Sequence, residues 1–314
     1  MKCLKPRVIV RTDVPVPAYA KAYKYAPNFV SSHPDWFMLV PCGHCASCRK
    51  AKTRENATKL LYESEQWTKS SFISLDYAPE NLPMMGERPD DVSKEEYYGS
   101  LYQAPYNFGS TLKRYEVADF IKRLREQYFR DNKERLNIRY FYCGEYGDKL
   151  GRPHYHIIMF GLDGSDQELL DKTWQLGNVK IGPVNVKTIQ YVTGYVRKKL
   201  NGKLGKKVYG YRVPPFQGQS HDIVNFDKFP PLVRKQIETR LYQDLSCKID
   251  GHKTAIPRII LKRNEELHDL VQQNVDSPPL LHMLEDPYEF TRDCEQRTVD
   301  SVIGAQVHTK HSVF

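Results

Sequence analysis

The chain has 314 residues, 40% of them hydrophobic and 27% charged, which fits about two domains and excludes a chain too polar to form a core. Mean hydropathy is −0.61 and no run of about 18 apolar residues occurs, so we expect no transmembrane helix. The charged N-terminus also lacks the apolar stretch of a secretory signal. We therefore expect a soluble, cytoplasmic protein with no membrane partner.

The net charge of +9 is unevenly distributed. No acidic residue occurs between Asp171 and Asp222, whereas ten lysines and arginines do. A long segment of one sign repels itself unless a polyanion neutralises it, so we expect nucleic acid as the partner, with a solvated basic face as the alternative. The residues that we expect to contact DNA are Arg197, Lys199, Lys203, Lys206, Lys207 and Arg212.

The hydrophobic periodicity predicts a mixture of strands and helices in the first half of the chain. The expected elements are strands at 7–12 and 36–41, a helix at 53–67, a strand at 72–76, a long loop at 78–110 and an amphipathic helix at 112–130.

In the second half, we expect a hairpin followed by alternating elements. These are strands at 138–146 and 154–160, a helix at 166–174, a strand at 184–187, a helix at 189–200, a Gly/Lys loop to about 210, and helices at 230–245 and 257–273. The order predicts an α+β fold, with an antiparallel sheet of about five strands and flanking helices.

We divide the chain into four predicted segments by composition and motif content. They are an N-terminal strand pair with a Cys-rich, zinc-type element and a helix (1–70), a core that holds the sheet (71–213), a helical extension (214–275) and an irregular tail (276–314).

The sequence His154-Tyr155-His156 lies in a predicted strand. Alternation places both imidazoles on one face, roughly 6.5–7 Å apart at the backbone, where they can converge on one metal ion while Tyr155 points to the opposite face. A carboxylate would complete such a site. Glu145 on the preceding strand is the natural candidate and Asp148 in the turn is the fallback, because the turn leaves the register open. Two histidines at the edge of the core are the alternative interpretation.

Tyr191 and Tyr195 lie four residues apart in a predicted helix, so their hydroxyls share one face, with Lys198 nearly one turn beyond Tyr195. A free tyrosine has a pKa near 10 and is a weak nucleophile; against a phosphate it needs a metal and a neighbouring cation. An aromatic stripe that packs the helix is the alternative. The Arg-Lys-Lys run after Val196 is an unusual surround for a packing face.

Three cysteines, Cys42, Cys45 and Cys48, fall within seven residues and offer three corners of a tetrahedral zinc site. Cys3 is the expected fourth ligand, because antiparallel pairing of strands 7–12 and 36–41 would place it beside Cys42; His44 competes with it. An iron–sulfur cluster and free thiols remain the alternatives, although the spacing lacks the downstream Cys-Pro of common clusters.

Four segments resemble the HUH endonuclease superfamily, and within it the replication-initiation proteins of microviruses of the gokushovirus type. They are Pro41-Cys42-Gly43-x-Cys45-x-x-Cys48, Gly144-Glu145-Tyr146-Gly147, Arg152-Pro153-His154-Tyr155-His156-Ile157-Ile158 and Tyr191-Val192-x-Gly194-Tyr195-Val196-x-Lys198-Lys199. Phe72–Tyr77 is similar to the first superfamily motif, with Asp76 where the family often has Thr. The resemblance covers about residues 1–215.

The resemblance implies a rolling-circle replication initiator with its endonuclease core at 71–213. In this interpretation His154, His156 and Glu145 hold Mg²⁺ or Mn²⁺, Tyr191 and Tyr195 are the nucleophiles that form a 5′-phosphotyrosine with single-stranded origin DNA, and Lys198 assists them. Host polymerase and helicase are the implied partners, in the host bacterial cytoplasm. The chain itself lacks the Gly-x-x-x-x-Gly-Lys motif that a helicase would carry.

Three other functions fit part of the pattern. A zinc-containing protein that binds single-stranded nucleic acid without cleaving it would explain the basic segment but not the spacing of the histidines and tyrosines. A nucleotidyl hydrolase or transferase with a histidine nucleophile would carry a third histidine where Ile158 stands. A relaxase or transposase would share the tyrosine chemistry.

Overall fold

The computed structural model of the chain describes residue 3 and residues 6–12, 14–24, 26–43, 45–99, 109–147, 151–195, 202–249 and 251–273. They fall into two compact units: one joins the chain up to Lys52 with the part from His268 onward, and the other spans Thr53–Leu267. Among the described residues, no helix combines the length and apolar content that a bilayer crossing requires. The predicted tail from residue 276 lies outside the described residues.

The N-terminal unit is built on two short antiparallel strands, β1 (Arg7–Val10) and β2 (Phe37–Val40). The chain between them forms 3₁₀ turns at Ala18–Tyr23 and Pro34–Trp36 and the short helix α1 (Pro27–Ser32). A small core of Ala20, Val30 and Phe37 holds these turns together. The predicted pairing of the two strands is confirmed.

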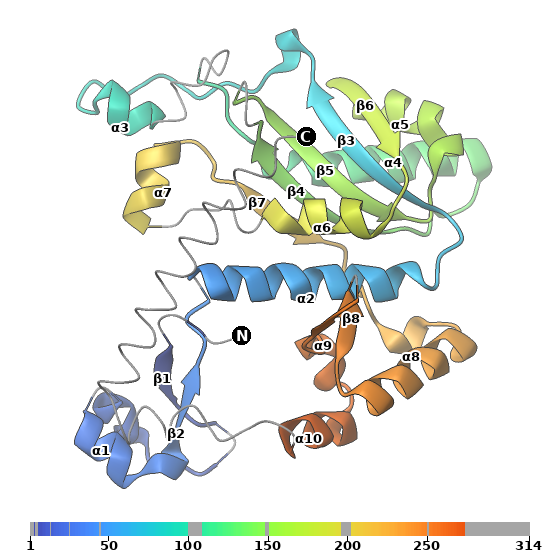
Figure 1. Cartoon of the computed structure of the whole chain (residues 1–314). Helices are drawn as coiled ribbons and strands as arrows, with labels where there is room; N and C mark the ends of the chain where they lie inside the picture. Colours follow the sequence, from blue (N-terminus) through green and yellow to red (C-terminus); the bar gives the residue numbers. More distant parts are fainter. Residues whose placement is uncertain are drawn as a thin grey trace. The chain divides into compact units, whose positions relative to one another are not determined.

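The second unit contains a five-stranded antiparallel sheet in the order β6-β3-β5-β4-β7 (Figure 1). Its strands are β3 (Ser70–Tyr77), β4 (Arg139–Tyr146), β5 (Pro153–Phe160), β6 (Gly177–Gly182) and β7 (Phe216–Gln219). The predicted α+β class with an antiparallel sheet of about five strands is confirmed.

One face of the sheet packs against α4 (Glu116–Asn132) and α5 (Gln167–Trp174). The helix α4 forms because Val117, Phe120, Ile121 and Leu124 follow the helical repeat, and all four are buried. They meet Tyr155 and the other core-facing side chains of the central strand β5. This dry face carries the main hydrophobic core.

The opposite face of the sheet carries the short helix α6 (Val186–Gly194), which contacts β4 and β5. Its start is set by Asn185 and Thr188, whose side chains cap each other's backbone N–H groups at 3.0 and 2.9 Å. The later part of α2 (Ala46–Ser64) reaches the same face, where the Asn56 amide donates to Gln217 at 3.4 Å. This face is therefore the more polar of the two.

The remaining elements are α3 (Lys94–Tyr98), α7 (Gly202–Tyr209), α8 (Pro231–Asp244), β8 (Cys247–Ile249), β9 (His252–Thr254), α9 (Arg258–Leu261) and α10 (Glu265–Gln273), with 3₁₀ turns at Pro79–Asn81, Gly164–Asp166 and Phe226–Lys228.

Three predictions about these elements were wrong. The strand expected at 184–187 lies earlier, at β6, because Pro183 cannot donate a ladder hydrogen bond and Asn185 starts a helix instead. The expected Gly/Lys loop contains α7, and the short strand β7 was missed because Gly218 and two glutamines hide any alternation. The sheet thus extends beyond residue 213, where we expected the core to end.

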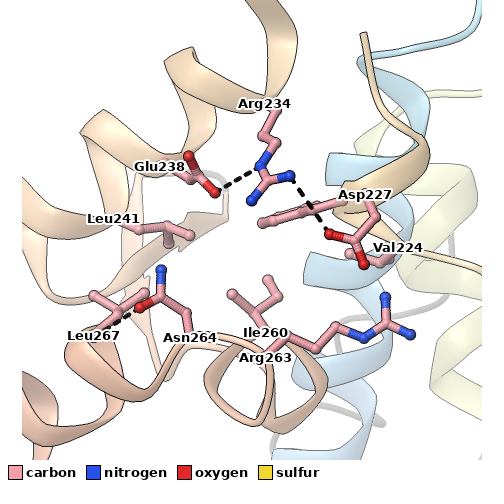
Figure 2. Close-up of a pocket in the computed structure, with 10 residues that line it drawn as sticks. Val224, Asp227, Arg234, Glu238, Leu241, Ile260, Arg263, Asn264 and Leu267 are labelled. Atoms are coloured by element: carbon pink, nitrogen blue, oxygen red, sulfur yellow. Dashed lines mark hydrogen bonds and ion pairs between the residues drawn. The ribbon is translucent and has the colours of Figure 1, made fainter. Parts of the chain in front are cut away.

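The helical extension encloses a small pocket of about 40 Å³, well below the roughly 300 Å³ of a ligand site. Figure 2 shows Arg234 between Glu238 and Asp227, at 2.9 and 3.5 Å, above the apolar side chains of Leu241 and Ile260. Because the charges pair with one another, this pocket is a packing feature of the extension.

The tyrosine between the two histidines has a structural role. The Tyr155 hydroxyl, fully buried, donates to the Lys113 carbonyl at 2.8 Å, accepts from the Lys113 N–H at 3.0 Å and lies 2.9 Å from the Tyr77 hydroxyl. We expect Tyr155→Phe to lower the free energy of unfolding by about 1–3 kcal/mol, because three buried polar groups lose their partner. Urea unfolding measures this, with the exposed Tyr115→Phe as the control that should change little. An unchanged midpoint for Tyr155→Phe would contradict the assignment.

Candidate functional site

The register between β4 and β5 brings the predicted metal ligands together. Glu145 pairs directly with His154, and Cys143 pairs with His156, so the three side chains lie on the same face of the sheet. Glu145 Oε1 is 2.9 Å from His154 Nε2 and 3.2 Å from His156 Nε2, and the two nitrogens are 3.1 Å apart. The register therefore selects Glu145. The alternative Asp148 lies outside the described residues.

The three groups are largely buried, and they stabilise one another's charge. Burial alone would raise the pKa of the Glu145 carboxyl, but hydrogen bonds from His154 and His156 lower it to about 2. Burial opposes the charged form of His154, yet the Glu145 carboxylate raises its pKa. Burial and the neighbouring His154 lower the pKa of His156. The site holds a carboxylate whose charge is compensated by one imidazole more than by the other.

The triangle of ligand atoms fits one divalent ion. Adjacent ligands of an octahedral ion with bonds of about 2.1 Å lie about 3.0 Å apart, close to the three observed separations of 2.9, 3.1 and 3.2 Å. Two Nε2 atoms at 3.1 Å cannot both carry protons directed at each other, so at least one lone pair points into the group. Two imidazoles and a carboxylate on one side would leave the other side of an ion open to a phosphate oxygen.

Both predicted tyrosines reach this group from α6. The Tyr191 hydroxyl is 3.5 Å from His156 Nε2, and the Tyr195 hydroxyl bonds to Glu145 and to Tyr191. The Tyr195 ring stacks on the His156 imidazole at 5.6 Å, with Tyr191 edge-on to it. Tyr195 directly follows α6 with helical dihedrals, so the four-residue spacing places the rings together as expected.

The two tyrosines differ in their access to solvent. Tyr191 is 49% exposed, whereas Tyr195 is 6% exposed. Burial, and then the hydrogen bond to the Glu145 carboxylate, raise the pKa of Tyr195 far above its usual value, so this hydroxyl keeps its proton in the structure. A strand of DNA arriving from solvent would meet Tyr191 first.

The strand β3 adds side chains to the site that the sequence analysis did not identify. Asp76 pairs across the strands with His154, and its carboxylate is 3.2 Å from the Lys180 ammonium on β6. Phe72 stacks on His156 at 5.4 Å. The alternation of Phe72, Ser74 and Asp76 along a strand was visible in the sequence, but its pairing partner was not.

The predicted DNA-binding residues have different outcomes. Lys206 and Lys207 are exposed on α7. Arg212 is a correction: it is 2% exposed, and its guanidinium donates to the Ser110 carbonyl at 2.9 Å and to the Tyr98 carbonyl, so it supports the backbone and offers no surface to DNA. Arg197, Lys199 and the predicted catalytic Lys198 lie outside the described residues, as does the side chain of Lys203.

A second candidate metal site lies in the N-terminal unit. The Sγ atom of Cys3 is 3.5 Å from that of Cys48 and 3.8 Å from that of Cys45, and Cys42 and Cys48 are 4.0 Å apart. The edges of a zinc–thiolate tetrahedron with bonds of about 2.3 Å are about 3.8 Å long. The Cys42 N–H also donates to Cys3 Sγ at 3.2 Å, so Cys3 takes the expected fourth place. The competitor His44 lies outside the described residues.

The sequence comparisons identify similar proteins. Residues 102–200 match the model of a family of replication-associated proteins, which is named after the protein ORF2. The replication-associated protein VP4 of Bdellovibrio phage phiMH2K is 28% identical over 177 residues, covering 51% of this chain and 48% of that protein. The replication-associated protein ORF2 of Spiroplasma virus 4 is 28% identical over 181 residues, covering 52% and 49%.

The chain spans about half or less of the length of the curated relatives it matches. A solved structure, the N-terminal nuclease domain of non-structural protein-1 of minute virus of mice, matches 49% of this chain and 76% of that chain, with 12% identity and a TM-score of 0.21. The sequence matches confirm the resemblance that the motifs predicted: the chain is a relative of the phage replication-associated proteins, and its residues 102–200 match the model of the ORF2 family.

Proposed function

We propose that the chain initiates rolling-circle replication by cutting and rejoining single-stranded DNA at a phage origin through tyrosine. The convergence of two tyrosine hydroxyls on the Glu145–His154–His156 group carries this proposal. A protein that only binds DNA has no need for hydroxyls beside a compensated metal-ligand set. The relatives, which are phage replication-associated proteins, support an origin as the substrate.

His154, His156 and Glu145 would hold Mg²⁺ or Mn²⁺, which would polarise the scissile phosphate and favour negative charge on its oxygens. The exposed Tyr191 attacks phosphorus in line. The P–O3′ bond breaks as the P–O(Tyr) bond forms, the phenolic proton is released, and the 3′ oxygen leaves to become a hydroxyl. Tyr195, held through Glu145, serves the second transfer that releases the product. The phosphotyrosine keeps the energy of the broken bond, so rejoining needs no ATP.

Two further parts of the proposal concern surroundings. Lys198 would neutralise charge beside the tyrosines, and Arg197, Lys199, Lys203, Lys206 and Lys207 would line the path of the strand. Host polymerase would extend the 3′ hydroxyl and a host helicase would unwind the duplex, in the host bacterial cytoplasm. The four cysteines would hold a structural Zn²⁺.

Replacing the tyrosines tests the chemistry. We expect Tyr191→Phe to remove most of the first covalent adduct, because its hydroxyl is the exposed one, and Tyr195→Phe to retain it. The double variant should form none. Labelled oligonucleotides that tile the parent genome, incubated with Mn²⁺ and run on denaturing gels, reveal the adduct, and Tyr115→Phe is the control. Adduct that survives in the double variant would refute the tyrosine assignment.

Replacing a metal ligand tests the second component. We expect His154→Ala to weaken Mn²⁺ binding at least tenfold and to abolish nicking, while binding of single-stranded DNA persists. Calorimetry with Mn²⁺ and the nicking assay measure the two effects. His221→Ala, an exposed histidine in the same unit, is the matched control. Metal-dependent nicking at the normal rate in His154→Ala would remove this histidine from the mechanism.

Elemental analysis tests the cysteine cluster. We expect one zinc atom per chain, lost in Cys45→Ser because an alcohol is a poor zinc ligand. Cys247→Ser, a buried cysteine outside the cluster, should keep the zinc. Protein purified without chelators that contains no zinc, or a Cys45→Ser variant that retains it, would be incompatible with the assignment.

A further inference from the structure

The first 52 residues carry most of the net positive charge of the chain. They hold nine lysines and arginines against two aspartates, a net charge of +7 out of the +9 of the whole chain. The segment 172–221, on which the sequence analysis concentrated, is therefore one of two basic regions. A unit this small and this basic is suited to a polyanion.

The same segment contains a continuous stack of aromatic rings. Tyr23 stacks on Phe29 at 4.7 Å, Phe29 on His33 at 4.5 Å, and His33 on Trp36 at 4.3 Å, with interplanar angles of 27–29°. Tyr19 lies edge-on to Tyr23, Phe29 and Trp36 at 6.4–6.5 Å. Five rings thus form one cluster between β1 and β2.

The cluster has an anchored side and an exposed side. Phe29 and Trp36 pack against the small core of the unit, whereas Tyr19 is 57% exposed and Tyr23 is 47% exposed. A tyrosine whose ring half faces solvent leaves about half of its apolar surface unburied, although it has neighbours on which it could fold. Lys21, also exposed, lies between these two tyrosines in the same 3₁₀ turn.

The backbone holds this surface in place. The turn Ala18–Tyr23 lies over the buried Ala20, and the strands β1 and β2 flank the whole aromatic segment. At the base of these strands, Cys3 and Cys42 meet in the cysteine cluster, which closes the segment at both ends. Rings presented on a closed frame lose little conformational entropy when a ligand stacks on them.

We propose that this N-terminal surface binds single-stranded DNA, with unpaired bases stacking on Tyr19 and Tyr23 and phosphates contacting Lys21 and the neighbouring basic residues. Exposed aromatic rings beside positive charge are the features by which proteins hold single strands without reading sequence. The bases of a duplex are stacked on each other and cannot offer their faces, so the surface favours the single strand. This binding site is separate from the proposed nuclease and does not depend on it.

A comparison of bases with tyrosines tests the proposal. The full chain and the variant Tyr19→Ser/Tyr23→Ser are titrated, in the absence of divalent metal, with a fluorescent oligo-dT and with an abasic strand of the same length. We expect the wild type to bind oligo-dT at least tenfold more tightly than the abasic strand, a difference within the range of base–aromatic stacking. The serine variant should lose most of this difference.

Three controls make the result specific. Tyr19→Phe/Tyr23→Phe keeps both rings and should bind oligo-dT as the wild type does. Tyr115→Ser/Phe129→Ser removes two rings of similar exposure from the other unit and should also bind normally. Because no metal is added, the assay is independent of nicking, so a failure of the tyrosine chemistry would not affect it.

The opposite outcomes overturn the proposal. If the serine variant retains the full difference between oligo-dT and the abasic strand, the bases stack elsewhere. If it loses affinity equally for both strands, the tyrosines support folding and not stacking. If the wild type shows no preference for bases, or if the serine variant changes only the oligomeric state in sedimentation, the surface serves another partner.

Discussion

The hydrogen-bonded register between β4 and β5 is the constraint on which the candidate site depends. Pairing of Glu145 with His154 places a carboxylate oxygen 2.9–3.2 Å from two imidazole nitrogens. A slip of one residue would turn Glu145 to the opposite face, because side chains alternate along a strand. The opposite face is the hydrophobic core, where Tyr146 and Tyr155 are buried, so the core that stabilises the fold also holds the register of the site.

The electrostatics of the site follow from this register. A buried carboxylate is costly unless it is paired, and here two imidazoles and a tyrosine hydroxyl compensate it. The same carboxylate raises the pKa of the Tyr195 hydroxyl, while Tyr191 stays half exposed. Two tyrosines that look equivalent in the sequence therefore occupy different environments, which suits two transfers that follow one another.

The chain presents two ligand sets of different chemistry. Four thiols in one unit form a closed, sulfur-only group, whereas the sheet of the other unit offers two nitrogens and an oxygen. Thiolates favour zinc in a structural site, and a mixed nitrogen and oxygen set with an open side favours an ion that must also bind a phosphate. The ligand types thus separate the structural and the reactive roles without relying on affinity alone.

Local sequence determined much of this protein. The spacing of His154 and His156, of Tyr191 and Tyr195, and of the three clustered cysteines follows from strand, helix and loop geometry, which act over a few residues. Only the tertiary structure decided the rest: that Glu145 faces the histidines, that Asp76 and Lys180 join them, that Arg212 is buried, and that rings between Tyr19 and Trp36 stack. These outcomes depend on register and packing between segments far apart in the chain, which periodicity does not encode.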